Sequence, residues 1–258
     1  MTVPVDLNYK SFGQGPPLII LHGLFGMLDN WQTLARRLAA DFTVYIVDQR
    51  NHGRSPHAEP HDYPTLAEDL RHFMETHWIY RAHLLGHSMG GKTVMQFAFE
   101  YPDMVDHLVV ADIAPAGYPR RHDFIFEALF AVPLDRIESR NEAKAILERY
   151  LDEPAIVQFL LKNLARQPDG TFRWKFNLPV LYKYYDAIIG PVEGEPFEGP
   201  TLFIKGGASD HITEAHLPQI ERLFPHSRLE VMEGVGHWVH AEQPDRFLQL
   251  VQAFLPKG

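Results

Sequence analysis

Residues 86–93, Gly-His-Ser-Met-Gly-Gly-Lys-Thr, are the part of this sequence whose residue types and spacing could most directly do chemistry. They contain Gly-x-Ser-x-Gly, a pattern that places a serine on a sharp turn between a strand and a helix. They also satisfy Gly-x-x-x-x-Gly-Lys-Thr, the pattern of a loop that binds phosphate through backbone N–H groups. The eight residues alone leave two alternatives open: a serine nucleophile at Ser88, or a nucleotide-binding loop.

A serine nucleophile needs further groups, because a free hydroxyl is weakly reactive. His237 is the candidate general base, and it lies between the last expected strand and the last expected helix. An acyl-transfer reaction also needs donors for the oxyanion that forms. The backbone N–H groups of Met89, directly after the serine, and of Leu24, in an early loop, are the candidates for that oxyanion hole.

Three features favour the serine nucleophile over the phosphate loop. Met89 is bulky where a phosphate loop favours small residues, and the pattern follows several expected strands rather than the first. A phosphate loop would also leave the pairs His22-Gly23 and Gly236-His237 without a purpose. Under this interpretation, Lys92 and Thr93 are ordinary residues of the helix that follows the nucleophile.

Short apolar runs without polar alternation predict strands that are buried on both faces, as in a parallel sheet. Helical patterns lie between them, and such alternation predicts an α/β fold with a mostly parallel, doubly wound sheet. The expected strands are 17–22, 42–48, 83–86, 107–112, 201–204 and 228–232, and the expected helices are 29–39, 65–78, 91–100, 214–223 and 244–254.

Polar residues stand at the carboxyl ends of the expected strands, which is where ligands bind in such sheets. Because parallel strands end at one edge of the sheet, these residues should lie near one another in space. They are His22, Asp48, Ser88, Asp112, Asp210 and His237.

The alternation stops between residues 115 and 195, where only helices are expected. Loop-type segments at 114–119 and 190–196 bound this stretch. We therefore expect an α/β core of residues 1–114 and 196–258, with residues 115–195 inserted as a helical cap. The expected cap helices are 122–131, 139–151, 154–165 and 177–189.

The composition excludes several classes of function. The 258 residues carry 24 Lys and Arg against 33 Asp and Glu, a net charge of −9, which disfavours nucleic acid as a partner. The N-terminus does not resemble a signal peptide, and no apolar run is long enough for a bilayer span, so we expect a cytoplasmic protein without stable membrane insertion. The apolar segment 124–130 is interpreted as a cap helix beside an acyl pocket, with membrane contact as the alternative.

The absence of cysteine excludes disulfides, thiolate catalysis and zinc–thiolate sites. Fifteen histidines raise the possibility of a metal site. Yet the pairs His57/His61 and His237/His240 lack carboxylate or thiolate companions at a suitable spacing. We therefore expect no metal ion.

Several segments together resemble one family of serine hydrolases. They are His22-Gly-Leu-Phe-Gly26, Arg50-Asn-His-Gly53, Gly86-His-Ser-Met-Gly90, Asp112-Ile-Ala-Pro115, Arg120-Arg-His-Asp123 and Gly236-His-Trp-Val-His-Ala-Glu242. In order and in detail they are similar to the YbfF-type esterases of the α/β-hydrolase superfamily. The resemblance covers nearly the whole chain. It implies a serine esterase with a helical cap that acts on short- to medium-chain acyl esters or thioesters, without a metal or cofactor.

The acid of the catalytic triad has two candidates. The commonest α/β-hydrolase position corresponds to Asp210, whereas the YbfF-type pattern places the acid at Asp112. We favour Asp112, although this chain departs from the family pattern by offering both. Phe25 and Trp238 flank the oxyanion and base loops and are candidate walls of the substrate pocket.

The chemistry of a Ser-His-Asp triad does not fix the substrate. A small-molecule acyl ester is expected, while thioester hydrolysis and C–C bond hydrolysis use the same triad and stay open. The oligomeric state cannot be derived from the sequence.

Overall fold

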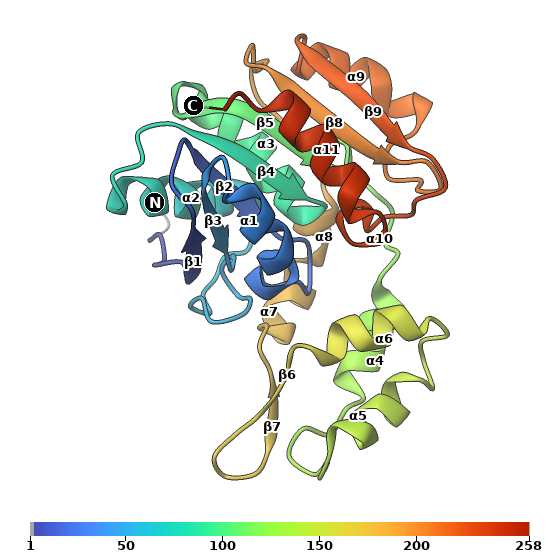
Figure 1. Ribbon diagram of the computed structural model, residues 1–258. Helices are drawn as coiled ribbons and strands as arrows, with labels where there is room; N and C mark the ends of the chain where they lie inside the picture. Colours follow the sequence, from blue (N-terminus) through green and yellow to red (C-terminus); the bar gives the residue numbers. More distant parts are fainter. Residues whose placement is uncertain (1–2, 258) are drawn as a thin grey trace.

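The structure, a computed structural model, describes residues 3–257. Figure 1 shows a central sheet with helices on both faces and a second lobe formed by the chain between β5 and β8. The strand order in the sheet is β1-β3-β2-β4-β5-β8-β9, and β1 alone runs antiparallel to its neighbour. The strands are β1 Tyr9–Phe12, β2 Pro17–Leu21, β3 Thr43–Val47, β4 Ala82–His87, β5 Val105–Ala111, β8 Thr201–Gly206 and β9 Ser227–Met232.

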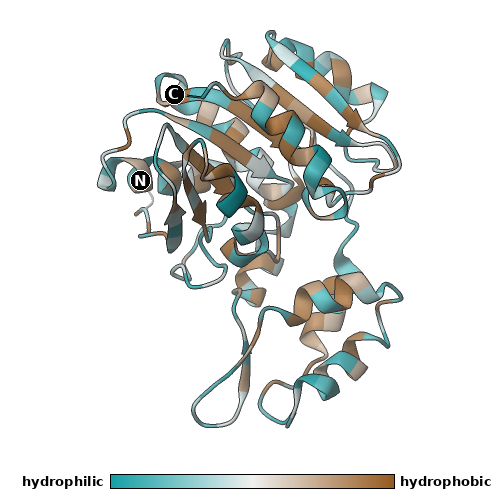
Figure 2. Cartoon of the chain, viewed as in Figure 1, coloured by the Kyte–Doolittle hydropathy of each residue, from teal (hydrophilic) through white to brown (hydrophobic). Residues whose placement is uncertain are grey.

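The inner strands are continuously apolar because helices cover both faces of the sheet. In β2, Leu18 and Ile20 pack toward α1 and α11, whereas Ile19 and Leu21 pack toward α2, α3 and α9. Figure 2 shows the hydrophobic colour concentrated on the strands of this sheet. The helices of the core are α1 Gln32–Leu38, α2 Tyr63–Thr76, α3 Met89–Glu100, α9 Leu217–Leu223, α10 Val239–Glu242 and α11 Pro244–Phe254, with short 3₁₀ helices at Leu28–Trp31, Pro102–Met104 and Glu214–His216.

The predicted α/β fold is confirmed, and each of the six expected strands is present. The sequence reasoning missed β1, whose four residues Tyr-Lys-Ser-Phe are mostly exposed at the edge of the sheet. Two of its four residues, Lys10 and Ser11, are polar, so it lacks the apolar signal that marked the expected strands.

The second lobe contains helices and one hairpin, so the expectation of helices alone was wrong. Strands Leu164–Arg166 (β6) and Phe172–Trp174 (β7) pair antiparallel where a helix was expected to run to residue 165. The missed signal was Pro168-Asp169-Gly170, a turn sequence in which Gly170 takes a positive φ of 91°. The helices of this segment are α4 Asp123–Phe130, α5 Arg140–Leu147, α6 Pro154–Leu161, α7 Leu178–Lys183 and α8 Tyr185–Ile189.

The end of this segment returns to the core before β8 begins. The Tyr63 hydroxyl of α2 donates to the carbonyl of Ile188 in α8 at 2.5 Å, and Figure 1 shows α8 close to the sheet while α4, α5 and α6 lie farther away. The division of the chain near residues 115 and 195 stays a prediction.

Helix α4 explains the apolar segment 124–130. Its buried side chains include Ile125, Phe126 and Leu129, which belong to one hydrophobic cluster with Phe25 of the core. Phe124 and Phe130 are about half exposed on its outer side. The burial pattern is that of an amphipathic helix lying on a protein core.

Candidate active site

Ser88 lies on a strained turn between β4 and α3. Its backbone has φ 54° and ψ −120°, outside the regions that side chains ordinarily allow. Strain of this kind costs about 1–3 kcal/mol and occurs where surrounding structure holds the residue for function. The flanking glycines are required by close packing, because a Cβ on Gly86 would lie 2.2 Å from the carbonyl oxygen of Gly90.

Asp112 follows β5, the neighbour of β4, and its carboxylate meets the His237 imidazole. The distance from His237 Nδ1 to Asp112 Oδ2 is 2.7 Å, and Asp112 is fully buried. Two further donors reach the same carboxylate: the Gly206 N–H at 2.8 Å and the Ser209 hydroxyl at 2.5 Å. Burial raises the pKa of Asp112, and these donors oppose that shift by favouring the charged form.

Asp210 points elsewhere. Both of its carboxylate oxygens lie 2.7 Å from Nη1 of Arg121, and its side chain is largely exposed. The Arg121 hydrogen bond lowers the pKa of Asp210. Of the two candidate acids, the structure therefore pairs Asp112 with His237.

His237 is held by groups on several sides. The His87 ring lies 4.7 Å away, and its Nε2 donates to the His237 carbonyl at 2.9 Å. His87 thus has a packing and anchoring role. With Nδ1–H directed at Asp112, Nε2 of His237 keeps the lone pair that a base needs. Burial lowers the pKa of His237, so the imidazole is neutral near pH 7 and can accept a proton.

His211 stacks against His237, with ring centroids 3.7 Å apart and 17° between the planes. Its Nδ1 lies 3.1 Å from the Ser209 oxygen. Because that hydroxyl gives its hydrogen to Asp112, Nδ1 of His211 must be the donor. Burial, followed by the His237 charge, lowers the pKa of His211 to about 3.

The loop with the predicted oxyanion donor Leu24 is fixed by two buried histidines. His52 Nε2 accepts from the Phe25 N–H at 3.3 Å, and His22 Nε2 accepts from the Gln49 N–H at 3.0 Å. A Cβ on Gly23 would lie 3.1 Å from the Ser88 Cβ, so the loop backbone passes close to the serine. This packing brings the backbone of Gly23 and Leu24 beside the residue that would react.

The carboxylate of Asp48 fixes the turn after β3. It accepts from the backbone N–H groups of Leu28 at 2.7 Å and Arg54 at 2.9 Å. Gly53 must be glycine, because its φ is 58° and a Cβ there would overlap the Asp48 carboxyl group at 2.1 Å. His52, on the same turn, is thereby aligned with the loop that carries Leu24.

A pocket lies beside Ser88, and its empty space, which includes open solvent at the mouth, is about 450 Å³. Most of its lining is apolar or aromatic. Ser88 is accompanied there by Leu24 and Met89, the two predicted oxyanion donors. The complete lining is Leu24, Tyr63, Ser88, Met89, Lys92, Ile113, Tyr118, Pro119, Arg121, His122, Tyr185, Ile188, Ile189 and His211.

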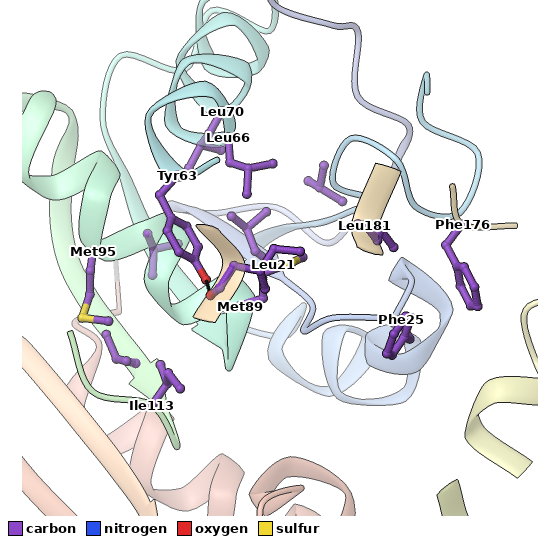
Figure 3. Close-up of a cluster of buried hydrophobic side chains, with 14 of the residues drawn as sticks. Leu21, Phe25, Tyr63, Leu66, Leu70, Met89, Met95, Ile113, Phe176 and Leu181 are labelled. Carbon is purple, nitrogen blue, oxygen red and sulfur yellow. Dashed lines mark hydrogen bonds between the residues drawn. The ribbon is translucent and has the colours of Figure 1, made fainter. Parts of the chain in front are cut away.

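Phe25 and Trp238, the expected pocket walls, are absent from this lining. Phe25 is buried and packs against Phe126 and Phe176, with both ring distances at 5.2 Å, and Figure 3 shows it in the buried cluster with Met89 and Phe176. The Trp238 ring packs at a tilt of 42° against Phe159 of α6, with ring centroids 5.4 Å apart. Both aromatics connect the core to the inserted lobe, because α6 and Phe126 belong to that lobe.

Lys92 is the residue that the sequence reasoning most undervalued. Its side chain is buried one turn after Ser88, and Nζ donates to the carbonyls of Ala116 at 2.8 Å, Ile189 at 3.3 Å and Gly190 at 2.5 Å. Ala116 lies where the chain leaves the core, and Gly190 lies where it returns. Burial lowers the pKa of Lys92 to about 7. These bonds commit the ammonium group to the chain itself, which argues against a phosphate loop.

The sequence analysis also missed Ser209 and His211 as site residues. Both flank Asp210, which was considered as a candidate acid. Their position just after the end of β8 at Gly206 could have indicated a role in the site. Only the three-dimensional turn shows that Ser209, rather than Asp210, faces the Asp112 carboxylate.

Comparisons with known proteins identify the family of this chain. Residues 16–244 match the sequence profile of the family described as "alpha/beta hydrolase fold". The chain is 42% identical to Esterase YbfF of Escherichia coli K12 over 93% of this chain and 92% of that protein. The chain belongs to the α/β-hydrolase family. The expected resemblance to YbfF-type esterases is confirmed.

Two further relatives narrow the class of this α/β-hydrolase. A sn-1-specific diacylglycerol lipase of Xenopus laevis is 39% identical over 97% of this chain and 84% of that protein. The solved structure of a marine microorganism esterase has 42% identity and a TM-score of 0.96, covering 97% of this chain and 100% of that one. The hydrolase is therefore an enzyme of the esterase and lipase type.

The helices of the hydrolase were also compared with membrane spans. Within residues 3–257, none has both the length and the apolar composition that crossing a bilayer requires.

Proposed function

We propose that this α/β-hydrolase is a serine carboxylesterase that cleaves short- to medium-chain acyl esters through a covalent acyl-enzyme. Ser88 is the nucleophile, His237 the general base and Asp112 the residue that orients the base. The observation that carries the proposal is the 2.7 Å contact between His237 and a buried Asp112, on strand ends next to the strained Ser88 turn. A base oriented by a carboxylate beside an activated serine is the arrangement that acyl transfer requires.

The first half of the reaction forms the acyl-enzyme. His237 Nε2 takes the Ser88 proton as Oγ bonds to the acyl carbon, and the carbonyl oxygen becomes an oxyanion. The N–H groups of Leu24 and Met89 stabilise that charge, and each such donor contributes about 2.7–4 kcal/mol in related systems. The C–O bond to the alcohol then breaks, and His237 returns the proton to the leaving oxygen.

The second half releases the acid. Water gives a proton to His237 Nε2 and attacks the acyl carbon, and collapse of the second oxyanion frees the Ser88 oxygen, which regains the proton. Asp112 stays ionised and keeps Nδ1–H of His237 in place throughout. The apolar part of the pocket, including Leu24, Met89 and Ile113, accommodates the acyl chain.

Burst kinetics and covalent capture test the proposal. A chromogenic butyrate ester should release a burst equal to the enzyme concentration, and an organophosphate should add its mass to the peptide that contains Ser88. Ser88→Ala should lower kcat by about 10⁶-fold, as for other triad serines. The exposed Ser11 on β1 provides the matched control, Ser11→Ala, with unchanged turnover. Full turnover in Ser88→Ala would refute the mechanism.

A second candidate function is hydrolysis of the acyl bonds of glycerolipids. Four of the relatives, 36–39% identical to this chain, are named sn-1-specific diacylglycerol lipases. A series of acyl esters, acyl thioesters and a diacylglycerol in mixed micelles would separate the candidates. Values of kcat/KM highest for the soluble esters support a carboxylesterase, and values highest for the diacylglycerol support a lipase.

A further inference from the structure

A second cluster of titratable residues lies at the amino ends of β4 and β5. It consists of His83 near the start of β4 and of Asp106 and His107 near the start of β5. Ser88 stands beyond the other end of β4, about 17 Å away at about 3.3 Å per residue. This amino-end cluster is therefore outside the site described above.

A β-bulge brings the three side chains together. Ala82 pairs with Val105, yet Leu84 pairs with Leu108, so the single residue His83 opposes both Asp106 and His107. In a regular strand, neighbouring side chains point to opposite faces, and a bulge is the feature that re-aims one of them. As a result, one potential ligand atom from each of the three residues lies within 4.8 Å of the others.

The imidazole nitrogens in this cluster lack hydrogen-bond partners. His83 Nδ1 lies 3.5 Å from Asp106 Oδ2, and His107 Nδ1 lies 3.7 Å from Asp106 Oδ1. Both nitrogens are buried, and neither has a partner among residues 3–257. The His83 side chain is only 2% exposed. Buried polar atoms are normally paired, so two orphaned nitrogens around one carboxylate require an explanation.

The chemistry of the cluster matches that of a transition-metal cation. The buried Nδ1 atoms of His83 and His107 have no hydrogen-bond partner among the described residues, so a neutral ring can present either atom to a cation. Two ligands of a tetrahedral Zn²⁺ ion lie about 3.3 Å apart, close to the observed spacings of 3.5 and 3.7 Å. Two imidazoles and one carboxylate, completed by water, form a ligand set that Zn²⁺ accepts.

One neighbouring group opposes a cation. Arg81 Nη2 lies 3.5 Å from Asp106 Oδ1, and Arg81 Nε donates to the Val105 carbonyl. The Arg81 side chain is 59% exposed, so it can turn into solvent when a metal ion binds. Its charge weakens binding without blocking the ligand atoms.

We propose that His83, Asp106 and His107 bind a divalent transition-metal cation of the Zn²⁺ type. The bound ion joins the starts of the two central strands beside α11, where the His107 ring already packs against Phe254 at 5.4 Å. It acts on the stability of the fold, because no reacting group lies at this edge. One ligand comes from β4 and two adjacent ligands come from β5. Their spacing in the sequence does not match a metal-binding motif.

Calorimetry and thermal unfolding with Zn²⁺ alone test the proposal on EDTA-treated full-length protein. Asp112, His211 and His237 form another group that could take a metal, so all titrations use a His211→Phe background. We expect one equivalent of Zn²⁺ to bind, and the Tm to rise by about 5 °C or more when Zn²⁺ is about a hundredfold above Kd. Mg²⁺, which prefers oxygen ligands, should give no shift.

Variants of the ligands decide the outcome. His107→Gln and Asp106→Asn should each weaken Zn²⁺ binding by at least about tenfold. His226→Gln, which changes an exposed histidine, serves as the matched control with unchanged binding. Asp106 is partly exposed, so Asp106→Asn keeps the test valid if His107→Gln fails to fold. Absence of Zn²⁺ binding in the His211→Phe parent, or binding in both ligand variants as tight as in that parent, would overturn the proposal.

Discussion

The two ends of β4 and β5 hold clusters of the same composition, one aspartate and two histidines, in very different states. At the carboxyl end, Asp112 is fully buried and accepts from Gly206, Ser209 and His237 at 2.5–2.8 Å. At the amino end, Asp106 is partly exposed, and its histidines approach only to 3.5 and 3.7 Å.

The comparison shows that residue type does not decide what such a cluster does. The carboxyl-end cluster (Asp112, His211 and His237) has directed hydrogen bonds that fix which nitrogen carries a proton, as a general base requires. The amino-end cluster (His83, Asp106 and His107) leaves two imidazole nitrogens without hydrogen-bond partners, which is what the proposed metal site would use. The loops after β8 and β9 supply the additional donors at the carboxyl end.

The largest effect that bears on this contrast is expected from substitutions of the two candidate acids, Asp112 and Asp210. Asp112→Asn should lower kcat by about 10³–10⁴-fold, because the amide cannot hold His237 in the correct tautomer. Asp210→Asn is the matched control and should stay within about threefold of the parent, because Asp210 pairs with Arg121. Steady-state kinetics on a butyrate ester measure both. If Asp210→Asn were inactive and Asp112→Asn kept its activity, Asp210 would be the acid of the triad.

The pH dependence gives the next effect. His237 must be neutral to accept the Ser88 proton, and burial lowers its pKa from the model-peptide value of 6.5. Activity should therefore be constant near pH 7 and fall by about tenfold per pH unit only once the pH drops below that lowered pKa. Because burial lowers the pKa of His237 to about 3, profiles of kcat/KM from about pH 4 to about pH 8 should show no acidic limb from this group. An acidic limb centred above pH 7 would contradict the proposed environment of His237.

Lys92 extends the bonded network of the carboxyl end to both boundaries of the inserted segment. Lys92→Met should leave the carbonyl oxygens of Ala116 and Gly190 without their donor, while Ile189 keeps the Tyr118 amide, and should lower the free energy of unfolding by about 1–3 kcal/mol. Urea denaturation measures the loss, and Lys162→Met, at an exposed position, is the control. The backbone N–H of Tyr118 donates to the Ile189 carbonyl, so its hydrogen exchange should also become faster in the variant. Unchanged stability would show that Lys92 does not hold these boundaries.

The smallest effect is expected at the amino end. In metal-free protein, His107→Leu should change the free energy of unfolding by less than about 1 kcal/mol, because the replaced nitrogen has no partner to lose. Esterase turnover should stay within about twofold, and the same urea and kinetic measurements apply. A loss of several kcal/mol would mean that His107 and Asp106 are paired in solution, which would remove the contrast between the two clusters.

The sequence was sufficient to predict the α/β class and six strands of the central sheet, namely its five inner strands and the edge strand β9. The physical reason is that strands buried on both faces must be continuously apolar, and parallel strands end together. β1 and the β6–β7 hairpin lie outside this rule, because short edge strands bury little apolar surface. They were missed accordingly. The triad of Ser88, Asp112 and His237 stays a prediction.

The tertiary structure alone decided which neighbours the polar groups meet. Whether Asp112 or Asp210 pairs with His237 depends on how one loop turns after β8, and periodicity carries no information about that turn. The bulge that gathers His83, Asp106 and His107, and the three carbonyls around Lys92, likewise arise between segments far apart in the chain. Hydrophobic patterning sets the framework because burial is cumulative along a segment, whereas a hydrogen bond depends on two particular atoms that only the folded chain brings within 3 Å.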